Sequence, residues 1–145
     1  MERTFRAPDV DSLTEVVAFL SGELKAGDVV CFIGEMGAGK TTLIGKLLRS
    51  WGITAPVDSP TFALVNEFVR GDGVPLYHFD FYRLNNVTEA LQIGLEDYLG
   101  TNAICLMEWP QMVMDWLPEE RWVVRIQEQN GEREIKVERS RSEAY

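Results

Sequence analysis

The chain has 145 residues, of which 46% are hydrophobic and 26% are charged, a composition typical of one soluble globular domain. Its 14 Lys and Arg residues face 23 Asp and Glu residues, and the net charge of −9 argues against direct nucleic-acid binding, which usually needs a basic face. No apolar run approaches the roughly 18 residues of a membrane span, and residues 1–6 lack a signal-peptide core. These features favour a cytoplasmic protein without membrane contact.

Strand and helix patterns alternate along the chain. In order, the expected strands are residues 3–7, 29–33, 61–69, 76–82, 103–107, 122–126 and 134–137, and the expected helices are residues 12–24, 41–51 and 88–99. The first helix is expected to start at Ser12-Leu-Thr-Glu15, which has the spacing of a capping box. Two hairpins are expected, one around Arg70-Gly-Asp-Gly73 and one around Asn130-Gly131. This order predicts a single α/β domain over residues 1–139, with a mixed sheet, helices on both faces and a disordered tail at 140–145.

Residues 34–41 read GEMGAGKT, a full match to the phosphate-binding loop pattern G-x-x-x-x-G-K-[ST]. The loop lies between a buried strand and a helix whose Leu43, Leu47 and Leu48 share one face, which is the context that the motif requires. Its glycines let backbone N–H groups point at phosphate oxygens. In such a loop Lys40 reaches the β- and γ-phosphates and the Thr41 hydroxyl binds Mg²⁺. The sequence therefore predicts a P-loop domain that binds a nucleoside triphosphate, and the absence of an N-K-x-D motif favours ATP.

A P-loop enzyme also needs an acidic residue near Mg²⁺ at the end of a neighbouring strand. Glu108 closes the apolar strand Ile104-Cys-Leu-Met, which has the usual Walker B form, whereas Asp80 closes a more amphipathic strand. Period 2 would place His78, Asp80 and Tyr82 on one face of that second strand. Both carboxylates remain candidates at this point, and each also has a plain structural interpretation as a solvated or hydrogen-bonded side chain.

Two further features leave alternatives open, and the cysteines have one interpretation. His78 is either a satisfied core histidine or part of the site. Thr61, in Ser59-Pro-Thr-Phe62, either contacts the γ-phosphate or attacking water or belongs to an ordinary turn before a strand. Cys31 and Cys105 lie in apolar runs and are interpreted as buried reduced thiols.

The segments GEMGAGKTT, SPTF, YHFDFYRL and ICLMEWPQ, in this order and spacing, closely resemble the TsaE family, small bacterial ATPases needed to make threonylcarbamoyladenosine in tRNA. The resemblance runs from about Asp9 to Gln111. It implies an ATP site made by Gly37, Ala38, Gly39, Lys40, Thr41 and Thr42, with Mg²⁺ held by Thr41 and Glu108. It implies catalytic roles for Asp80, Lys40 and Thr61, and a family motif at His78, Asp80, Tyr82 and Arg83. Trp109 is also a family signature, and the segment around Val10 and Asp11 is implied near adenine.

The family association implies partners as well. By resemblance the chain binds and cycles a TsaB–TsaD heterodimer, contacts tRNA only indirectly, and hydrolyses ATP weakly without those partners. Two alternatives from other classes remain: a nucleotide-gated binding module without meaningful hydrolysis, and a small-molecule kinase. The kinase is less favoured because Arg83 is the only arginine near the motif strands, whereas kinases usually carry an arginine-rich lid. The C-terminal hairpin carries no motif, and nothing is inferred from it.

Overall fold

The computed structural model describes residues 1–56 and 64–140 of the chain. In this part the strands are β1 (Glu2–Ala7), β2 (Val29–Ile33), β3 (Val65–Val69), β4 (Pro75–Asp80), β5 (Ile104–Glu108), β6 (Arg121–Gln129) and β7 (Glu132–Ser140). The α-helices are α1 (Thr14–Glu23), α2 (Lys40–Ser50), α3 (Val87–Gln92) and α4 (Leu95–Leu99), with 3-10 helices η1 (Val10–Leu13) and η2 (Pro110–Trp116). All of the strands join one sheet in the order β1-β7-β6-β2-β5-β4-β3.

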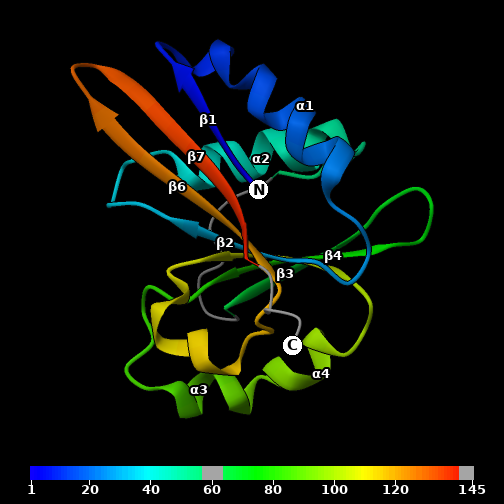
Figure 1. The fold of residues 1–145 in the computed structure, drawn as a ribbon. Coiled ribbons are helices and arrows are strands. Elements are labelled where there is room, and N and C mark those ends of the chain that lie inside the picture. The colour runs from blue at the N-terminus through cyan, green and yellow to red at the C-terminus, as the bar shows by residue number, and fades with distance from the viewer. Residues whose placement is uncertain (57–63, 141–145) are drawn as a thin grey trace.

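The central strands of the sheet pair in parallel, and the outer strands on each side pair antiparallel. Strand β2 runs parallel to both β5 and β6, and β4 runs parallel to β5. The hairpins β3–β4 and β6–β7 and the β1–β7 pair are antiparallel. Helices α1 and α2 cover one face of the sheet, and α3 and α4 lie on the other (Figure 1). The predicted α/β architecture with a mixed sheet and helices on both faces is confirmed.

The two faces of the sheet have separate apolar cores. One core joins α1 and α2 to alternate residues of the strands, such as Val30, Leu106 and Ile135. The other joins α3, α4 and η2 to the intervening residues, such as Cys31 and Met107. The predicted apolar face of α2 is confirmed, because Leu43, Leu47 and Leu48 are all fully buried in the first core. Burying both faces of β2 and β5 explains why their sequences are continuous apolar runs.

Two predictions about helices were wrong in detail. Ser12 does not cap the first α-helix: its backbone N–H and hydroxyl both donate to Asp9 Oδ1, at 2.9 and 2.8 Å. Asp9 therefore caps a 3-10 turn, and α1 begins only at Thr14. The predicted helix over residues 88–99 is two short helices, because Gly94 adopts a left-handed conformation with φ of 87° that ends the first helix and redirects the chain.

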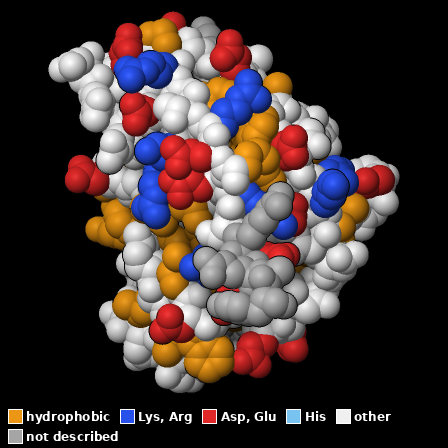
Figure 2. Space-filling model, in the orientation of Figure 1, with side chains coloured by type: hydrophobic (Ala, Val, Ile, Leu, Met, Phe, Trp, Pro, Cys, Tyr) orange, Lys and Arg blue, Asp and Glu red, His pale blue; other side chains and the backbone are white. Residues whose placement is uncertain are grey.

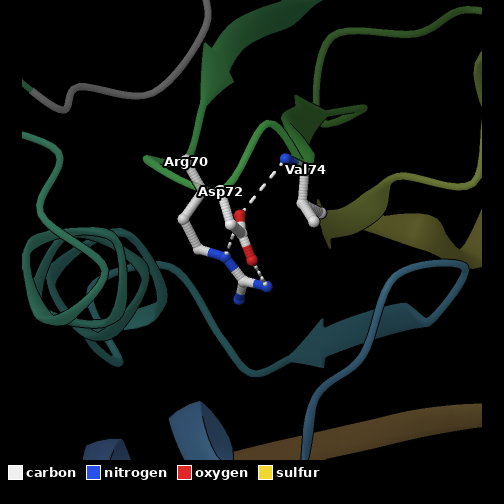
Figure 3. A network of polar contacts seen from close by, with 3 residues as sticks. All are labelled: Arg70, Asp72 and Val74. Atoms are coloured by element: carbon white, nitrogen blue, oxygen red, sulfur yellow. Dashed lines mark hydrogen bonds and ion pairs between the residues drawn. The ribbon is translucent and has the colours of Figure 1, made fainter.

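The predicted turn between β3 and β4 is confirmed, and a local ion pair holds it. The guanidinium of Arg70 donates to both carboxylate oxygens of Asp72, at 2.9 and 2.8 Å (Figure 3). Asp72 also accepts from the backbone N–H of Val74 at 3.2 Å. The hydrogen bond from Arg70 is the main reason why the pKa of Asp72 is lowered to about 2. The strand before this turn was expected to start at residue 61. Residues 57–63 lie outside the described part of the chain, and the described strand β3 starts at Val65.

The surface agrees with the acidic composition. On the face drawn in Figure 2, Lys and Arg side chains lie among Asp and Glu side chains and form no continuous basic area in that view. No helix in the described ranges has both the length and the apolar character to cross a membrane. Cys31 and Cys105 are both buried and free of disulfides, as predicted.

Candidate nucleotide-binding site

The candidate site lies where the central parallel strands end. Because β2, β4 and β5 are parallel, their carboxyl ends meet at one edge of the sheet, where ligands bind in open α/β folds. The register places Glu108 beside Phe32 on one side and beside Asp80 on the other. Both acidic residues predicted from the sequence therefore lie next to the loop that leaves β2 at Gly34.

The loop between β2 and α2 has the tight backbone that its glycines predict. A side chain at Gly34 would place a Cβ 2.8 Å from the backbone oxygen of Ile126, so only glycine fits there. Gly39 has a φ of 104° and forms the left-handed N-cap of α2, a conformation that is strained for residues with a side chain. The loop thus delivers the backbone N–H groups of the first turn of α2, and its positive helix end, to the edge of the sheet.

Lys40 is held in the loop by its own backbone. Its ammonium group donates to the carbonyl of Gly34 and, at 3.3 Å, to the carbonyl of Glu35. The same ammonium lies 3.8 Å from the ring centroid of Trp109, a cation–π distance. Burial lowers the pKa of Lys40, while the negative charges of Glu108 and Asp80 act in the opposite direction. No carboxylate of a described residue forms an ion pair with the Lys40 ammonium, and a phosphate oxygen can supply the missing negative charge.

Trp109, whose ring lies over the Lys40 ammonium, has an unusual backbone conformation. It follows β5 directly and adopts a φ of 53°, which costs a non-glycine residue free energy and is often found at functional sites. Its ring also packs against Tyr82, with centroids 5.0 Å apart. Two aromatic side chains from the ends of β4 and β5 therefore stand beside the phosphate-binding loop.

Glu108 links the loop helix to the sheet. Its Oε1 accepts a 2.8 Å hydrogen bond from the Thr41 hydroxyl, and its Oε2 lies 2.7 Å from His78 Nε2. An ionised carboxylate can only accept, so the Nε2–H of His78 is the donor. Lys40, His78 and Glu108 are the buried charged or polar side chains among the residues the structure describes. All three gather at this one edge, which indicates a functional site because isolated charges are rarely buried.

The oxygen atoms of Thr41 and Glu108 fit a magnesium ion. Mg²⁺ prefers oxygen ligands and is usually held by one or two protein groups together with phosphates and water. Here a hydroxyl and a carboxylate already lie in contact at the start of α2. Within residues 1–56 and 64–140 no group of three or more His, Cys, Asp or Glu residues could hold a metal by itself. Water molecules and the phosphates of a bound nucleotide would complete the coordination of such an ion.

Asp80 differs from Glu108 in its contacts. Its Oδ1 accepts a 3.0 Å hydrogen bond from the backbone N–H of Tyr82, and it is half-buried. Burial, with a smaller contribution from the charge of Glu108, raises the pKa of Asp80, although the Tyr82 hydrogen bond opposes this. A carboxylate with a raised pKa is a better proton acceptor than an ordinary aspartate.

These groups surround one pocket of about 270 Å³. Its walls include the predicted ATP-binding residues Gly37, Ala38, Gly39, Lys40, Thr41 and Thr42, with Asp80, Glu108 and Trp109. A larger hollow of about 580 Å³ adjoins it, between the loop and the far end of β6. Most of the predicted site residues are thus brought together. Thr61 lies outside the described residues, as do the side chains of Val10 and Asp11, and Arg83 is exposed in the turn after β4.

One pocket residue was missed by the sequence analysis. Arg133, near the start of β7, lines the same pocket, and its Nε–H donates to the carbonyl of Ala38 at 2.8 Å. A signal existed, because period 2 places Arg133 on the same face of its strand as the apolar Ile135 and Val137. What the sequence could not show is that β6 pairs with β2, which carries the C-terminal hairpin to the loop.

A parallel strand, a glycine-rich loop, a helix beginning with Lys-Thr and a carboxylate on the adjacent strand together define a P-loop α/β domain. The family described as "Threonylcarbamoyl adenosine biosynthesis protein TsaE" matches residues 7–136. The chain therefore belongs to the TsaE family.

Individual relatives agree with this assignment. The chain is 38% identical to the tRNA threonylcarbamoyladenosine biosynthesis protein TsaE of Bacillus subtilis over 92% of this chain and 81% of that protein. It is 40% identical to the Haemophilus influenzae protein of the same name, over 72% of this chain and 65% of that protein. The crystal structure of Bacillus subtilis YdiB superimposes with a TM-score of 0.78 at 30% identity, covering 97% of this chain and 86% of that one.

Proposed function

We propose that this chain is a Mg²⁺-dependent ATPase that supports threonylcarbamoyladenosine modification of tRNA by binding and cycling a TsaB–TsaD heterodimer. The observation that carries the proposal is the gathering of Lys40, Thr41 and Glu108 around a glycine-rich loop at one edge of the sheet. Membership of the TsaE family supports the link to threonylcarbamoyladenosine, and the TsaB–TsaD partners come from the family resemblance.

The residues of the pocket have different roles in phosphoryl transfer. Backbone N–H groups from Gly37 to Thr42 bind the phosphates. The Lys40 ammonium leaves the loop carbonyls to which it donates and binds the β- and γ-phosphate oxygens instead. Thr41 and Glu108 would hold Mg²⁺, which would neutralise negative charge on those phosphates. Asp80 orients the attacking water or accepts its proton, a role that its raised pKa favours.

The acidic surface favours a role beside tRNA and not directly on it. With a net charge of −9, the chain lacks the excess of cations that usually displaces counterions from nucleic-acid phosphates. Partner subunits are therefore proposed to make the tRNA contacts, and the cytoplasm, where tRNA is modified, is the proposed location.

Phosphate release from ATP, measured with and without TsaB–TsaD, tests this proposal. We expect slow release by the chain alone and a clear increase on adding the heterodimer, in both cases only with Mg²⁺. A fast basal rate that the heterodimer leaves unchanged would indicate an independent enzyme. ATP-dependent binding to the heterodimer without phosphate release would indicate a nucleotide-gated module, and a phosphorylated metabolite would indicate a kinase.

A further inference from the structure

The side chain of Arg133 is fixed against the phosphate-binding loop by the strands around it. Its backbone pairs with Ala7 of β1 on one side and with Glu128 of β6 on the other. Its side chain shares a face with Ile135 and Val137, which are buried in the core that contains α1 and α2. The guanidinium therefore extends along the face of the sheet where α2 begins.

The contact with the loop is close. Arg133 Nε donates to the Ala38 carbonyl at 2.8 Å, and a Cβ on Gly39 would come within 3.1 Å of the same nitrogen. Glycine at this position thus leaves room for the guanidinium as well as allowing the left-handed backbone. An arginine has five N–H donors, and within the described residues the side chain of Arg133 uses only Nε. The two terminal nitrogens remain available to a ligand in the pocket.

Among the described residues, no carboxylate pairs with the charge of Arg133. By contrast, Arg6 on the adjacent strand is paired with Glu134, and Arg139 near the other end of β7 is paired with Asp28. Arg133 lines the same pocket as Lys40 and Thr41. Guanidinium groups bind phosphate oxygens through paired N–H donors, so an unpaired arginine beside a phosphate-binding loop is suited to a polyphosphate.

From this geometry we propose that Arg133 binds the phosphate chain of the nucleotide, so that the C-terminal hairpin supplies in the same chain the arginine that the loop lacks. The inference rests on the proposed nucleotide binding and adds a residue and a structural element to it. Phosphoryl-transfer sites commonly use an arginine in addition to the loop lysine and Mg²⁺. The hydrogen bond to Ala38 would hold Arg133 at the loop before the nucleotide arrives.

The test is the affinity of three variants for ATP and ADP by calorimetry, at low and at moderate salt. Arg133→Gln removes the charge, and Arg133→Lys keeps the charge but loses the planar guanidinium. Arg6→Gln is the matched control, because it removes the same charge from the adjacent strand, where Arg6 is exposed and pairs with Glu134 at 3.5 Å. Urea unfolding of each variant checks that the domain remains folded.

We expect Arg133→Gln to weaken ATP and ADP binding at least tenfold and to make binding less sensitive to salt, because one screened charge contact is lost. Arg133→Lys should recover part of the affinity and Arg6→Gln should match the wild type. If Arg133 only braces the loop, Arg133→Gln will lose affinity without a change in salt sensitivity, which overturns the inference, as does wild-type affinity in that variant. If the wild type binds neither nucleotide, the proposed function fails and this inference with it.

Discussion

The hydroxyl of Thr41 and the carboxylate of Glu108 form a 2.8 Å hydrogen bond across 67 positions of sequence. Thr41 lies in the first turn of the helix that follows the loop, and Glu108 ends the neighbouring strand β5. The second carboxylate oxygen is held 2.7 Å from His78 Nε2. Glu108 is therefore oriented by two elements of the fold, and its position does not depend on a ligand.

Replacing this carboxylate tests its proposed role with the metal. Glu108→Gln keeps the size of the side chain and removes the charge that favours Mg²⁺. We expect ATP affinity measured with Mg²⁺ to fall at least tenfold, and affinity measured with EDTA to change little. Glu96→Gln, at an exposed position of α4, is the control for loss of one negative charge. Unchanged Mg²⁺-dependent affinity would remove Glu108 from the metal site.

Asp80 is expected to affect hydrolysis more than binding. Asp80→Asn keeps the hydrogen-bond acceptor for the N–H of Tyr82 but removes the proton acceptor. Since a positioned base typically contributes 10²–10⁴-fold, phosphate release in the presence of TsaB–TsaD should fall about a hundredfold with ATP affinity nearly unchanged. Asp72→Asn, in the turn of the same hairpin, should leave both measurements unchanged. If Asp80→Asn abolishes Mg²⁺-dependent binding instead, the roles of Asp80 and Glu108 are exchanged.

Lys40 is the proposed cation for the β- and γ-phosphates. Lys40→Ala should weaken ATP binding at least tenfold, about 1.4 kcal/mol, because a buried charge that faces the phosphates is lost. Lys46→Ala, at a half-buried position of the same helix, controls for the loss of a lysine from α2. Calorimetric titration with ATP and Mg²⁺ is the measurement. Near-wild-type affinity in Lys40→Ala would show that the loop does not cradle phosphate.

The sequence predicted the loop and both carboxylates because each lies in a local pattern. A glycine-rich motif follows one apolar run, and Glu108 closes another. The sequence analysis also expected an acidic residue at the end of a strand next to the loop, and the structure places Glu108 there because β2 and β5 are parallel. The pairing of His78 with Glu108 was not predicted, because it depends on the register between β4 and β5.

Two other features lay beyond local patterns for different reasons. Arg133 reaches the site only because the C-terminal hairpin pairs with β2 through β6, a long-range choice of strand order. The split between α3 and α4 was missed because a single Gly94 inside an apolar helical pattern is compatible with a continuous helix. Its left-handed backbone shows that the turn was favoured instead.

His78 should contribute to stability through Glu108. His78→Leu leaves one buried carboxylate oxygen without its donor, which typically costs about 1–3 kcal/mol in the free energy of unfolding. The same substitution in a Glu108→Gln background should cost less, because the charge that needs the donor is gone. Urea unfolding of the two single variants and the double variant gives the coupling between the residues, expected to exceed about 0.5 kcal/mol. Additive losses would mean that the 2.7 Å contact contributes nothing.

The buried thiols predict a loss of stability at alkaline pH. Burial raises the pKa of Cys31 to about 11, although Arg121 acts in the opposite direction, and burial raises the pKa of Cys105 to about 12. Because the unfolded thiols have an ordinary pKa of 9.0, the folded state holds their protons more tightly. This contribution is fully present below pH 9.0 and is lost as the pH rises toward the folded values.

A variant without thiols isolates this effect from that of other groups that titrate in the same range. Cys31→Ala combined with Cys105→Ala is expected to be less stable than the wild type near neutral pH, because it removes two buried side chains. Its free energy of unfolding in urea should nevertheless fall less between about pH 7 and about pH 10 than that of the wild type. An equal fall in both proteins would mean that the thiols do not carry the alkaline loss, and that lysine or tyrosine side chains do.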